Sequence, residues 1–385
     1  MTKFFAYERL TWPDIAALPR DVPLIIPLGQ GYDQAQVAGT LGNPLQVGML
    51  PAIPFGWRGS GLAVAEELLG RLVANLLDSL RDDGFSRVYA LCPPGFDLGL
   101  GPARIALPHP AQINSTPPLP ADDEREKVVL IPIGHTEQHG HHLAMSTDTV
   151  IIEAISQSVA AATPAQAATL PVFPYGVSTH RASFAGTLNA GGRAFEDFWL
   201  EVIGTLVSRG FTRFYLLSGH GGNCSFLVNV AKYAGERYGR IFCATAWLYL
   251  SGPDGVAALQ KYRRSAIGGM GHAGELETAL MLHLRPDLVQ MERVVDETDF
   301  IATPSYYMDW VEGGTLIANP PWGDDSATGA YGAGSLATAE NGQLWLEAAI
   351  AEKINHVAEI HEQYRRRESR RNSGFGLWGR TQSLI

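Results

Sequence analysis

The hydrophobic positions of this chain form short apolar runs that alternate with longer stretches of helical periodicity. Six apolar runs have the length of a strand, namely residues 22–28, 87–92, 128–133, 169–173, 214–218 and 241–247. Six amphipathic stretches predict helices, namely residues 62–82, 149–162, 194–209, 225–238, 276–284 and 342–365. Because strands separated by helices form βαβ units, the pattern predicts an α/β protein with a mostly parallel sheet.

Three segments of the first hundred residues recur in the same order later in the chain. The matched pairs are 22–29 with 128–134, 50–56 with 170–176, and 84–89 with 210–215. The order predicts a degenerate first copy over 1–110, a Pro-rich linker over 111–125, a complete copy over 126–365 and a tail over 366–385. The alternative is that α/β units share strand and turn patterns by chance.

The composition narrows the class of protein. Of the 385 residues, 46% are hydrophobic and 18% are charged, which is typical of a globular protein. Three scattered cysteines, Cys92, Cys224 and Cys243, indicate a reducing compartment. The net charge of −10 without a basic stripe argues against nucleic-acid binding. No apolar run approaches the ~20 residues of a membrane span, and the N-terminus does not resemble a signal peptide, so we expect a cytoplasmic protein without membrane partners.

Histidines and carboxylates follow two of the predicted strands. The sequence His-Thr-Glu-Gln-His-Gly-His-His occupies 135–142 directly after strand 128–133, and Asp148 comes shortly afterwards. Ser-Gly-His-Gly-Gly-Asn occupies 218–223, after the strand that begins at 214. Since ligands collect beyond the carboxyl ends of parallel strands, we expect Glu137, His139 and His220 to converge. Imidazole and carboxylate together favour zinc, manganese or iron.

Other histidines are more often structural or surface residues. We expect a structural or surface role for four of them, namely His109, His283, His356 and His361. We interpret His141 as a neighbour of the site rather than a ligand. A third segment, His-Ala-Gly-Glu-Leu-Glu-Thr at 272–278, carries two more carboxylates.

Several motifs in register resemble those of the creatininase (creatinine amidohydrolase) family. They lie at 136–140, 142–143, 147–149, 175–178 with His180, 186–187, 219–223, 272–278, 328–332 and 337–340, and span most of residues 126–345. The resemblance implies a three-layer α/β/α fold around a two-metal centre. The family includes a hydrolase that opens the ring of 3-dehydro-scyllo-inosose, and this chain resembles that type as well.

The resemblance also implies roles for individual residues. Glu137 and His220 hold one divalent ion, His139 holds the second, and Asp148 bridges both. Creatininase has a glutamate ligand where this chain has Gly222, so the missing ligand is expected from Glu277 or, as the alternative, Glu275. Because residues two apart on a helix point about 200° away from each other, only one of them should reach the metal.

The family pattern assigns His272 as the catalytic histidine, and we expect Glu275 to orient it. Ser178 and His180 belong to the substrate-facing loop. Aromatic residues that would line a small ring are Trp247, Tyr306, Tyr307, Trp310 and Trp322.

The resulting hypothesis is a metal-dependent hydrolase that opens a small polar ring by attack of metal-bound hydroxide on a carbonyl. The ring is a cyclic keto-polyol such as 3-dehydro-scyllo-inosose, or a cyclic amide. Gly221 replaces an aromatic residue of creatininase, which argues against creatinine itself. The alternatives are an amidohydrolase or deformylase acting on a non-peptide C–N bond, and a non-catalytic metal-stabilised binding or assembly protein.

The first copy lacks every metal ligand. Pro94 stands where His220 stands in the second copy, and no Glu-x-His pair precedes Glu137. The apolar positions of the predicted helix 62–82, such as Leu72 and Leu76, require a partner surface. That surface is either the second copy or a neighbouring subunit, and the resemblance implies a homo-oligomer.

Overall fold

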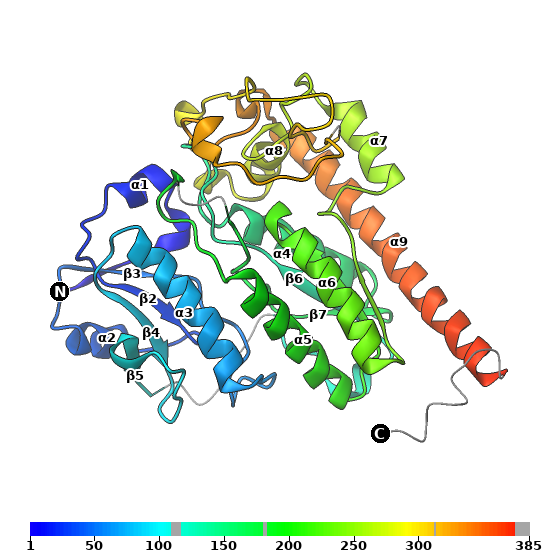
Figure 1. Cartoon of the computed structure of the whole chain (residues 1–385), viewed down its shortest axis with the longest axis horizontal. Helices are drawn as coiled ribbons and strands as arrows, with labels where there is room; N and C mark the ends of the chain where they lie inside the picture. The colour runs from blue at the N-terminus through cyan, green and yellow to red at the C-terminus, as the bar shows by residue number, and fades with distance from the viewer. Residues whose placement is uncertain (109–116, 180–182, 312, 374–385) are drawn as a thin grey trace.

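The computed structural model describes residues 1–108, 117–179, 183–311 and 313–373 and contains two parallel sheets (Figure 1). The first sheet has the order β1-β3-β2-β4-β5, with β1 Lys3–Ala6, β2 Leu24–Pro27, β3 Gln46–Met49, β4 Val88–Cys92 and β5 Arg104–Ala106. The second has the order β7-β6-β8-β9, with β6 Val128–Ile133, β7 Ala167–Thr169, β8 Arg213–Ser218 and β9 Phe242–Thr245.

Helices follow most of the strands. They are α1 Trp12–Ala16, α2 Gln34–Thr40, α3 Glu66–Asp82, α4 Thr147–Ala162, α5 Gly192–Ser208, α6 Gly221–Tyr238, α7 Pro253–Tyr262, α8 Glu275–Leu284 and α9 Ala339–Asn372. In the described ranges, no helix has the length and apolar content needed to cross a membrane.

The second sheet is covered on both faces, because successive side chains of a strand point to opposite sides. In β6, Val128 and Leu130 belong to a core shared with α4, α8 and α9. Val129 and Ile131 belong to the opposite core, which contains residues of α5 and α6. This is the α/β/α layering expected from the sequence, and it explains why β6 and β8 are buried along their whole length.

The first sheet is joined to the region that carries the second sheet through a single continuous core. Helix α3 lies beside α5 (Figure 1) and contacts it. Leu72 and Leu76 of α3 are fully buried in the same cluster as Phe198 and Trp199 of α5. Burying each leucine stabilises the fold by roughly 1.5–3 kcal/mol. The partner surface that α3 requires is therefore α5 of the same chain.

The strand order bears on the proposed repeat. Strands β3-β2-β4-β5 follow the same order as β7-β6-β8-β9, and every pairing in both sheets is parallel. Together with the three matched segments, this order supports our proposal that residues 1–110 are a degenerate copy.

Some elements differ from the sequence-based expectations. Strands β1, β3 and β5 and helices α1, α2 and α7 are additional, and all are short. Helix α9 continues to Asn372, beyond its predicted end at 365, and ion pairs of Arg366 with Glu362 and of Arg371 with Glu368 stabilise the extension. The predicted tail therefore begins inside this helix, and the predicted linker lies partly outside the described residues.

Candidate metal centre

The candidate ligands lie where β6 and β8 end side by side. Ile133 at the end of β6 pairs with Ser218 at the end of β8. The segment after β6 carries Glu137 and His139, and His220 follows β8 as the N-cap residue of α6. Because neighbouring parallel strands end at the same edge of the sheet, side chains more than eighty positions apart in the sequence meet there.

Asp148 lies at the centre of this cluster, in the first turn of α4. One carboxylate oxygen is 3.0 Å from His139 Nε2, and the other is 3.3 Å from His220 Nδ1. His220 Nδ1 is also 2.9 Å from Glu137 Oε2. The four side chains are buried, with exposed fractions of 5% or less. Asp148 therefore has the position of a bridge between two sets of ligands.

The two carboxylates at the start of α8 point in different directions. Glu277 Oε2 lies 3.8 Å from His139 Nε2 and accepts a hydrogen bond from the Ala273 amide at 2.6 Å. The Glu275 carboxylate instead accepts from the backbone amides of Arg264 and Ser265, at 2.8 Å and 2.7 Å. This divergence follows from the helical angle between residues two apart.

The structure does not bring Glu275 to His272, contrary to the orienting role expected from the sequence. Oε2 of Glu277 instead lies 4.0 Å from Nδ1 of the His272 imidazole. The physical reason is that the backbone amides of Arg264 and of buried Ser265 need an acceptor, and the buried Glu275 carboxylate provides it.

The protonation of the cluster reflects an excess of buried negative charge. Burial raises the pKa of Glu277 to about 7. Burial lowers the pKa of His139, but the adjacent Asp148 carboxylate outweighs it and raises the value to about 9. Glu137 and Asp148 likewise raise the pKa of His220 against the effect of burial. Buried carboxylates are costly unless cations pair with them.

This donor set fits divalent metal ions. Three overlapping groups have ligand atoms within 4.8 Å of one another, namely His135 with Glu137 and His220, Glu137 with His139 and His272, and His139 with Asp148 and Glu277. Imidazole nitrogens and carboxylate oxygens are the ligands of zinc and manganese sites. The residues of this cluster can therefore bind metal.

His272 is held as a neutral imidazole with a defined tautomer. Its Nε2 lies 2.7 Å from the carbonyl oxygen of Gln138, which can only accept, so Nε2 carries the proton. Burial lowers the pKa of His272 to about 3, and the charge of neighbouring His139 adds to the effect. The lone pair of Nδ1 therefore faces Glu277, and the indole of Trp322 lies edge-on to the ring at 4.8 Å.

The expected substrate-binding residues have different surroundings. Ser178 Oγ donates to Glu137 Oε1 at 3.0 Å, so it contacts a candidate ligand directly. Trp247 is 53% exposed, and its ring lies 4.0 Å from the point where a Cβ on Gly221 would be. Trp310 packs against Tyr249, with ring centroids 4.9 Å apart. His180 lies outside the described residues.

His135 is a site residue that the sequence analysis did not assign. Its ring lies 4.5 Å from that of His220, and its Nδ1 accepts from the Gly176 amide at 2.8 Å. The proton of the neutral ring is therefore on Nε2, which is buried and has no hydrogen-bond partner among the described residues. The sequence feature that could have identified His135 is its position at the start of the histidine-rich segment after β6.

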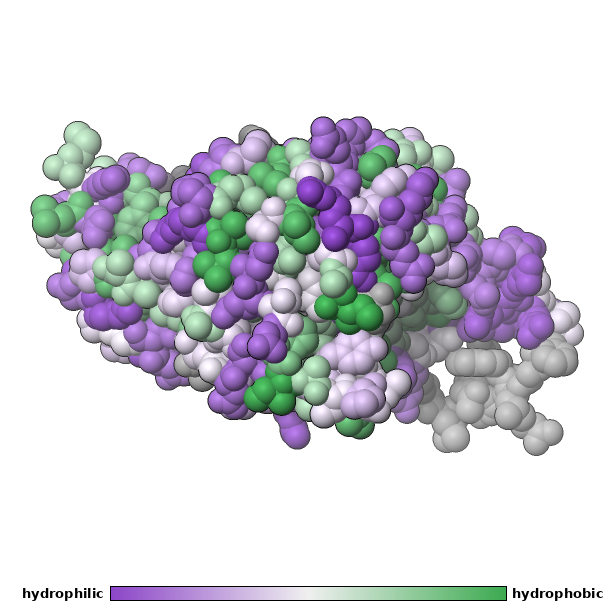
Figure 2. Space-filling view, turned by 90° about the horizontal axis from the view of Figure 1, so that it is seen from above, coloured by the Kyte–Doolittle hydropathy of each residue, from purple (hydrophilic) through white to green (hydrophobic). Residues whose placement is uncertain are grey.

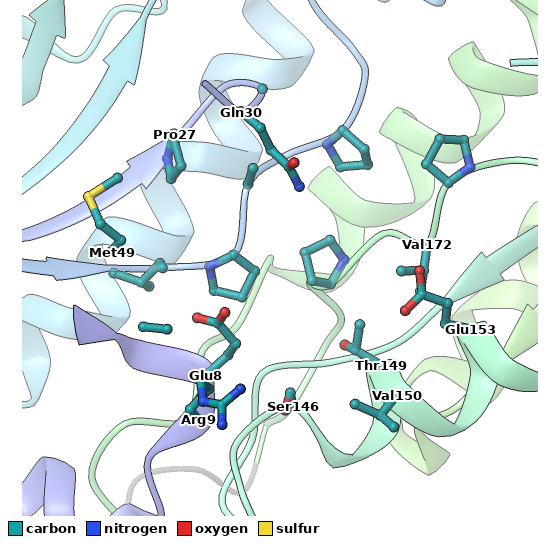
Figure 3. Close-up of a pocket in the computed structure, with 18 of the residues that line it drawn as sticks. Glu8, Arg9, Pro27, Gln30, Met49, Ser146, Thr149, Val150, Glu153 and Val172 are labelled. Carbon is teal, nitrogen blue, oxygen red and sulfur yellow. The ribbon is translucent and has the colours of Figure 1, made fainter. Parts of the chain in front are cut away.

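A groove of about 800 Å³ lies elsewhere, at the carboxyl edge of the first sheet (Figure 3). Gln30 and Met49 line it from the region of the first sheet, and Thr149 and Glu153 line it from α4. None of the candidate ligands lines this groove. The candidate ligands themselves are buried. Helices α7 and α8 lie at one end of the molecule (Figure 1), and the face seen from that end has polar and apolar residues interspersed (Figure 2).

A buried cluster of carboxylates and imidazoles at the carboxyl edge of an α/β/α sheet is the arrangement of a metal-dependent hydrolase. The family model described as Creatininase, creatinine amidohydrolase, matches residues 114–357, and the chain belongs to this family of hydrolases. The first sheet precedes the matched region.

Three relatives show the range of the family. A creatinine amidohydrolase of Pseudomonas putida is 30% identical over 236 residues, which cover 58% of this chain and 85% of that protein. A mycofactocin precursor peptide peptidase of Mycolicibacterium smegmatis is 34% identical over 175 residues, 44% of this chain and 62% of that protein. A 3-dehydro-scyllo-inosose hydrolase of Thermotoga maritima is 28% identical over 260 residues, 62% of this chain and 78% of that protein.

Solved structures agree with this membership. A structure of creatininase with manganese is 26% identical, with a TM-score of 0.52, and the match covers 63% of this chain and 93% of that one. A mutant creatininase complexed with creatine is 27% identical, with a TM-score of 0.51, and covers 63% of this chain and 94% of that one.

Proposed function

We propose that this protein is a two-metal hydrolase that opens a small polar ring by attack of hydroxide on a carbonyl carbon. The observation that carries the proposal is the position of Asp148, within 3.3 Å of both His139 and His220. Glu137 and His220 would hold one ion, His139 and Glu277 the other, and Asp148 both. Two such ions, zinc or manganese, lower the pKa of a shared water and polarise the carbonyl oxygen.

The protein's own groups supply proton transfer and orientation. His272 would pass a proton to the leaving group, because the Gln138 carbonyl fixes its tautomer and leaves Nδ1 able to accept. His135 would donate from Nε2 to an oxygen of the substrate. Ser178 would fix the orientation of Glu137 through its hydrogen bond.

The substrate class follows from the relatives and from the walls of the site. The creatinine amidohydrolase favours the C–N bond of a cyclic amide, and the peptide peptidase also favours an amide C–N bond. Because the inosose hydrolase is also a relative, a cyclic keto-polyol is the second candidate substrate. Hydroxide attack on a ketone would need the same site. Trp322 beside His272, and Trp247 over Gly221, would form aromatic walls for a small ring. Gly221 itself has no aromatic side chain, and the ring of Trp247 would take that place beside it.

The test is a substrate screen with the intact, metal-loaded chain. The panel contains creatinine, formamidopyrimidines and oxidised inositols. We expect turnover of one class that is abolished by chelation and by Asp148→Ala. A protein that binds two metals and turns over none of the panel would favour the non-catalytic binding or assembly role. Its mass in solution would also test the proposed homo-oligomer.

A further inference from the structure

We propose that the first copy completes the catalytic centre, with Trp12 of α1 as a positioning residue for His272. The inference rests on the proposed role of His272. It assigns a function to a region that has no metal ligands of its own.

Trp12 is presented by a short helix that is fixed at its start. The Thr11 hydroxyl donates to Asp14 Oδ2 at 2.7 Å, and the two residues form a capping box. Arg293 of the second copy contacts the other oxygen of Asp14 at 3.1 Å. Arg293 also contacts the Thr11 hydroxyl at 3.2 Å, so the helix is anchored to Arg293 on both sides of Trp12.

The indole of Trp12 connects the first copy to a loop beside the metal centre. Its Nε1 donates to the carbonyl oxygen of Thr328 at 2.8 Å. The ring lies 5.2 Å from that of His141 and 5.4 Å from that of Phe184. Thr328 is held both by this bond and by Glu297, which accepts from its amide at 3.0 Å. The Trp12 ring also packs against two further segments around the site.

The next residue of that loop contacts Gln138. The carbonyl oxygen of Gly329 accepts from Gln138 Nε2 at 2.9 Å. Gly329 has a φ of +84°, and a Cβ there would lie 2.1 Å from Gln138 Oε1, so the loop packs tightly against this amide. Gln138 in turn holds His272 through its carbonyl, and the Tyr331 amide donates to the carbonyl of His272 at 2.7 Å. A displacement of loop 328–331 would therefore displace His272.

A second loop, also held by the first copy, contacts Gln138 from another side. Tyr7 Oη donates to the Gly186 carbonyl at 2.9 Å, and Asp83 accepts from the Gly186 amide at 2.7 Å. The following residue, Thr187, accepts from the Gln138 amide through its hydroxyl at 3.0 Å. Gln138 lies between two loops that are both tied to the first copy, and this arrangement makes the first copy part of the site.

The test removes only the indole donor. Trp12→Phe keeps an aromatic ring but loses the bond to Thr328. Trp345→Phe is the matched control, because the Trp345 indole also donates to a backbone carbonyl, that of Ala258 at 3.1 Å, but in α9. Both variants are made in the full chain loaded with zinc, and hydrogen exchange is measured by mass spectrometry.

We expect amide exchange over residues 328–332 and 138–140 to be roughly tenfold faster in Trp12→Phe, because the loop opens more readily without this bond. Exchange there should be unchanged in Trp345→Phe, and both variants should keep their zinc. Unchanged exchange in Trp12→Phe, or faster exchange over the whole chain, would overturn the proposal. If Trp12→Phe does not fold, replacement of Trp12 by benzothienylalanine, which has the same shape without the N–H, gives the same comparison.

A kinetic measurement separates this inference from the proposed function. With any substrate found in the screen, Trp12→Phe should lower kcat with little change in KM, because it displaces His272 rather than a substrate contact. A raised KM with normal kcat would contradict positioning. If no substrate is turned over but the exchange difference is present, the proposed function fails while the structural coupling stands.

Discussion

Asp148 and His220 lie 3.3 Å apart, and the second carboxylate oxygen of Asp148 lies 3.0 Å from His139. We therefore expect Asp148→Ala to lose both metal equivalents, because a bridging carboxylate serves both ions. Elemental analysis of the purified variant measures this. Glu153→Ala, on the same helix but facing the groove, is the control and should keep both metals. Full metal content in Asp148→Ala would refute the two-metal assignment.

The pair Glu275 and Glu277 offers a matched comparison of a structural and a ligating carboxylate. Glu277→Gln should lose the metal held by His139, because its carboxylate lies 3.8 Å from that imidazole. Glu275→Gln should keep both metals but lower the free energy of unfolding by about 1–3 kcal/mol, because it weakens a buried acceptor of backbone amides. Metal analysis and denaturant unfolding distinguish the two. The reverse outcome would exchange their roles.

His272 is predicted to act in proton transfer rather than in metal binding. His272→Ala should therefore retain metal while kcat falls by roughly 10²–10⁴-fold. His283→Ala, an exposed histidine on α8, is the control and should have normal activity. Wild-type kcat in His272→Ala would show that the proton moves through another group.

The pKa shifts predict how metal binding depends on pH. Without metal, the pKa of His139 is raised from 6.5 to about 9 and that of Glu277 from 4.5 to about 7. Both groups hold protons more tightly in the folded state. Their contribution to stability is therefore complete below pH 4.5 for Glu277 and pH 6.5 for His139, and is lost as pH rises to about 7 and about 9.

Metal must displace these protons, so its affinity should rise over the same range. We expect the increase in Tm on adding zinc or manganese to grow between about pH 6 and pH 9. Over the same range, deprotonation of Glu277 and His139 should lower the Tm of the metal-free chain. Thermal unfolding with and without a chelator measures both. A metal-induced increase in Tm that is independent of pH would show that the ions bind elsewhere.

Removal of the first copy should expose the apolar face of α5. Residues 118–385 retain every candidate ligand but lose α3, whose Leu72 and Leu76 share a core with Phe198 and Trp199. We expect this fragment to aggregate, because exposed apolar patches of this kind associate. Solution mass and metal content of the fragment test this. A soluble fragment with two metals and the oligomeric state of the intact chain would show that the first copy is a detachable appendage.

The sequence predicted the parts of the site that depend on strand ends. Glu137 and His220 follow long apolar runs, so their meeting at one sheet edge was foreseeable. The partner of Glu275 was not, because its amide donors at 264 and 265 lie in an irregular segment without periodicity. The contact of Trp12 with Thr328 joins positions 316 apart in the sequence, and no local pattern encodes it.

The shared core between α3 and α5 has a consequence for the behaviour of the protein in dilute solution. A covering surface on a separate subunit dissociates on dilution, whereas one on the same chain is present at an effective concentration in the millimolar range. The surface that packs on α5 and contacts both loops beside Gln138 is part of the same chain as those loops. This contact should therefore persist at nanomolar protein concentrations, whatever the oligomeric state.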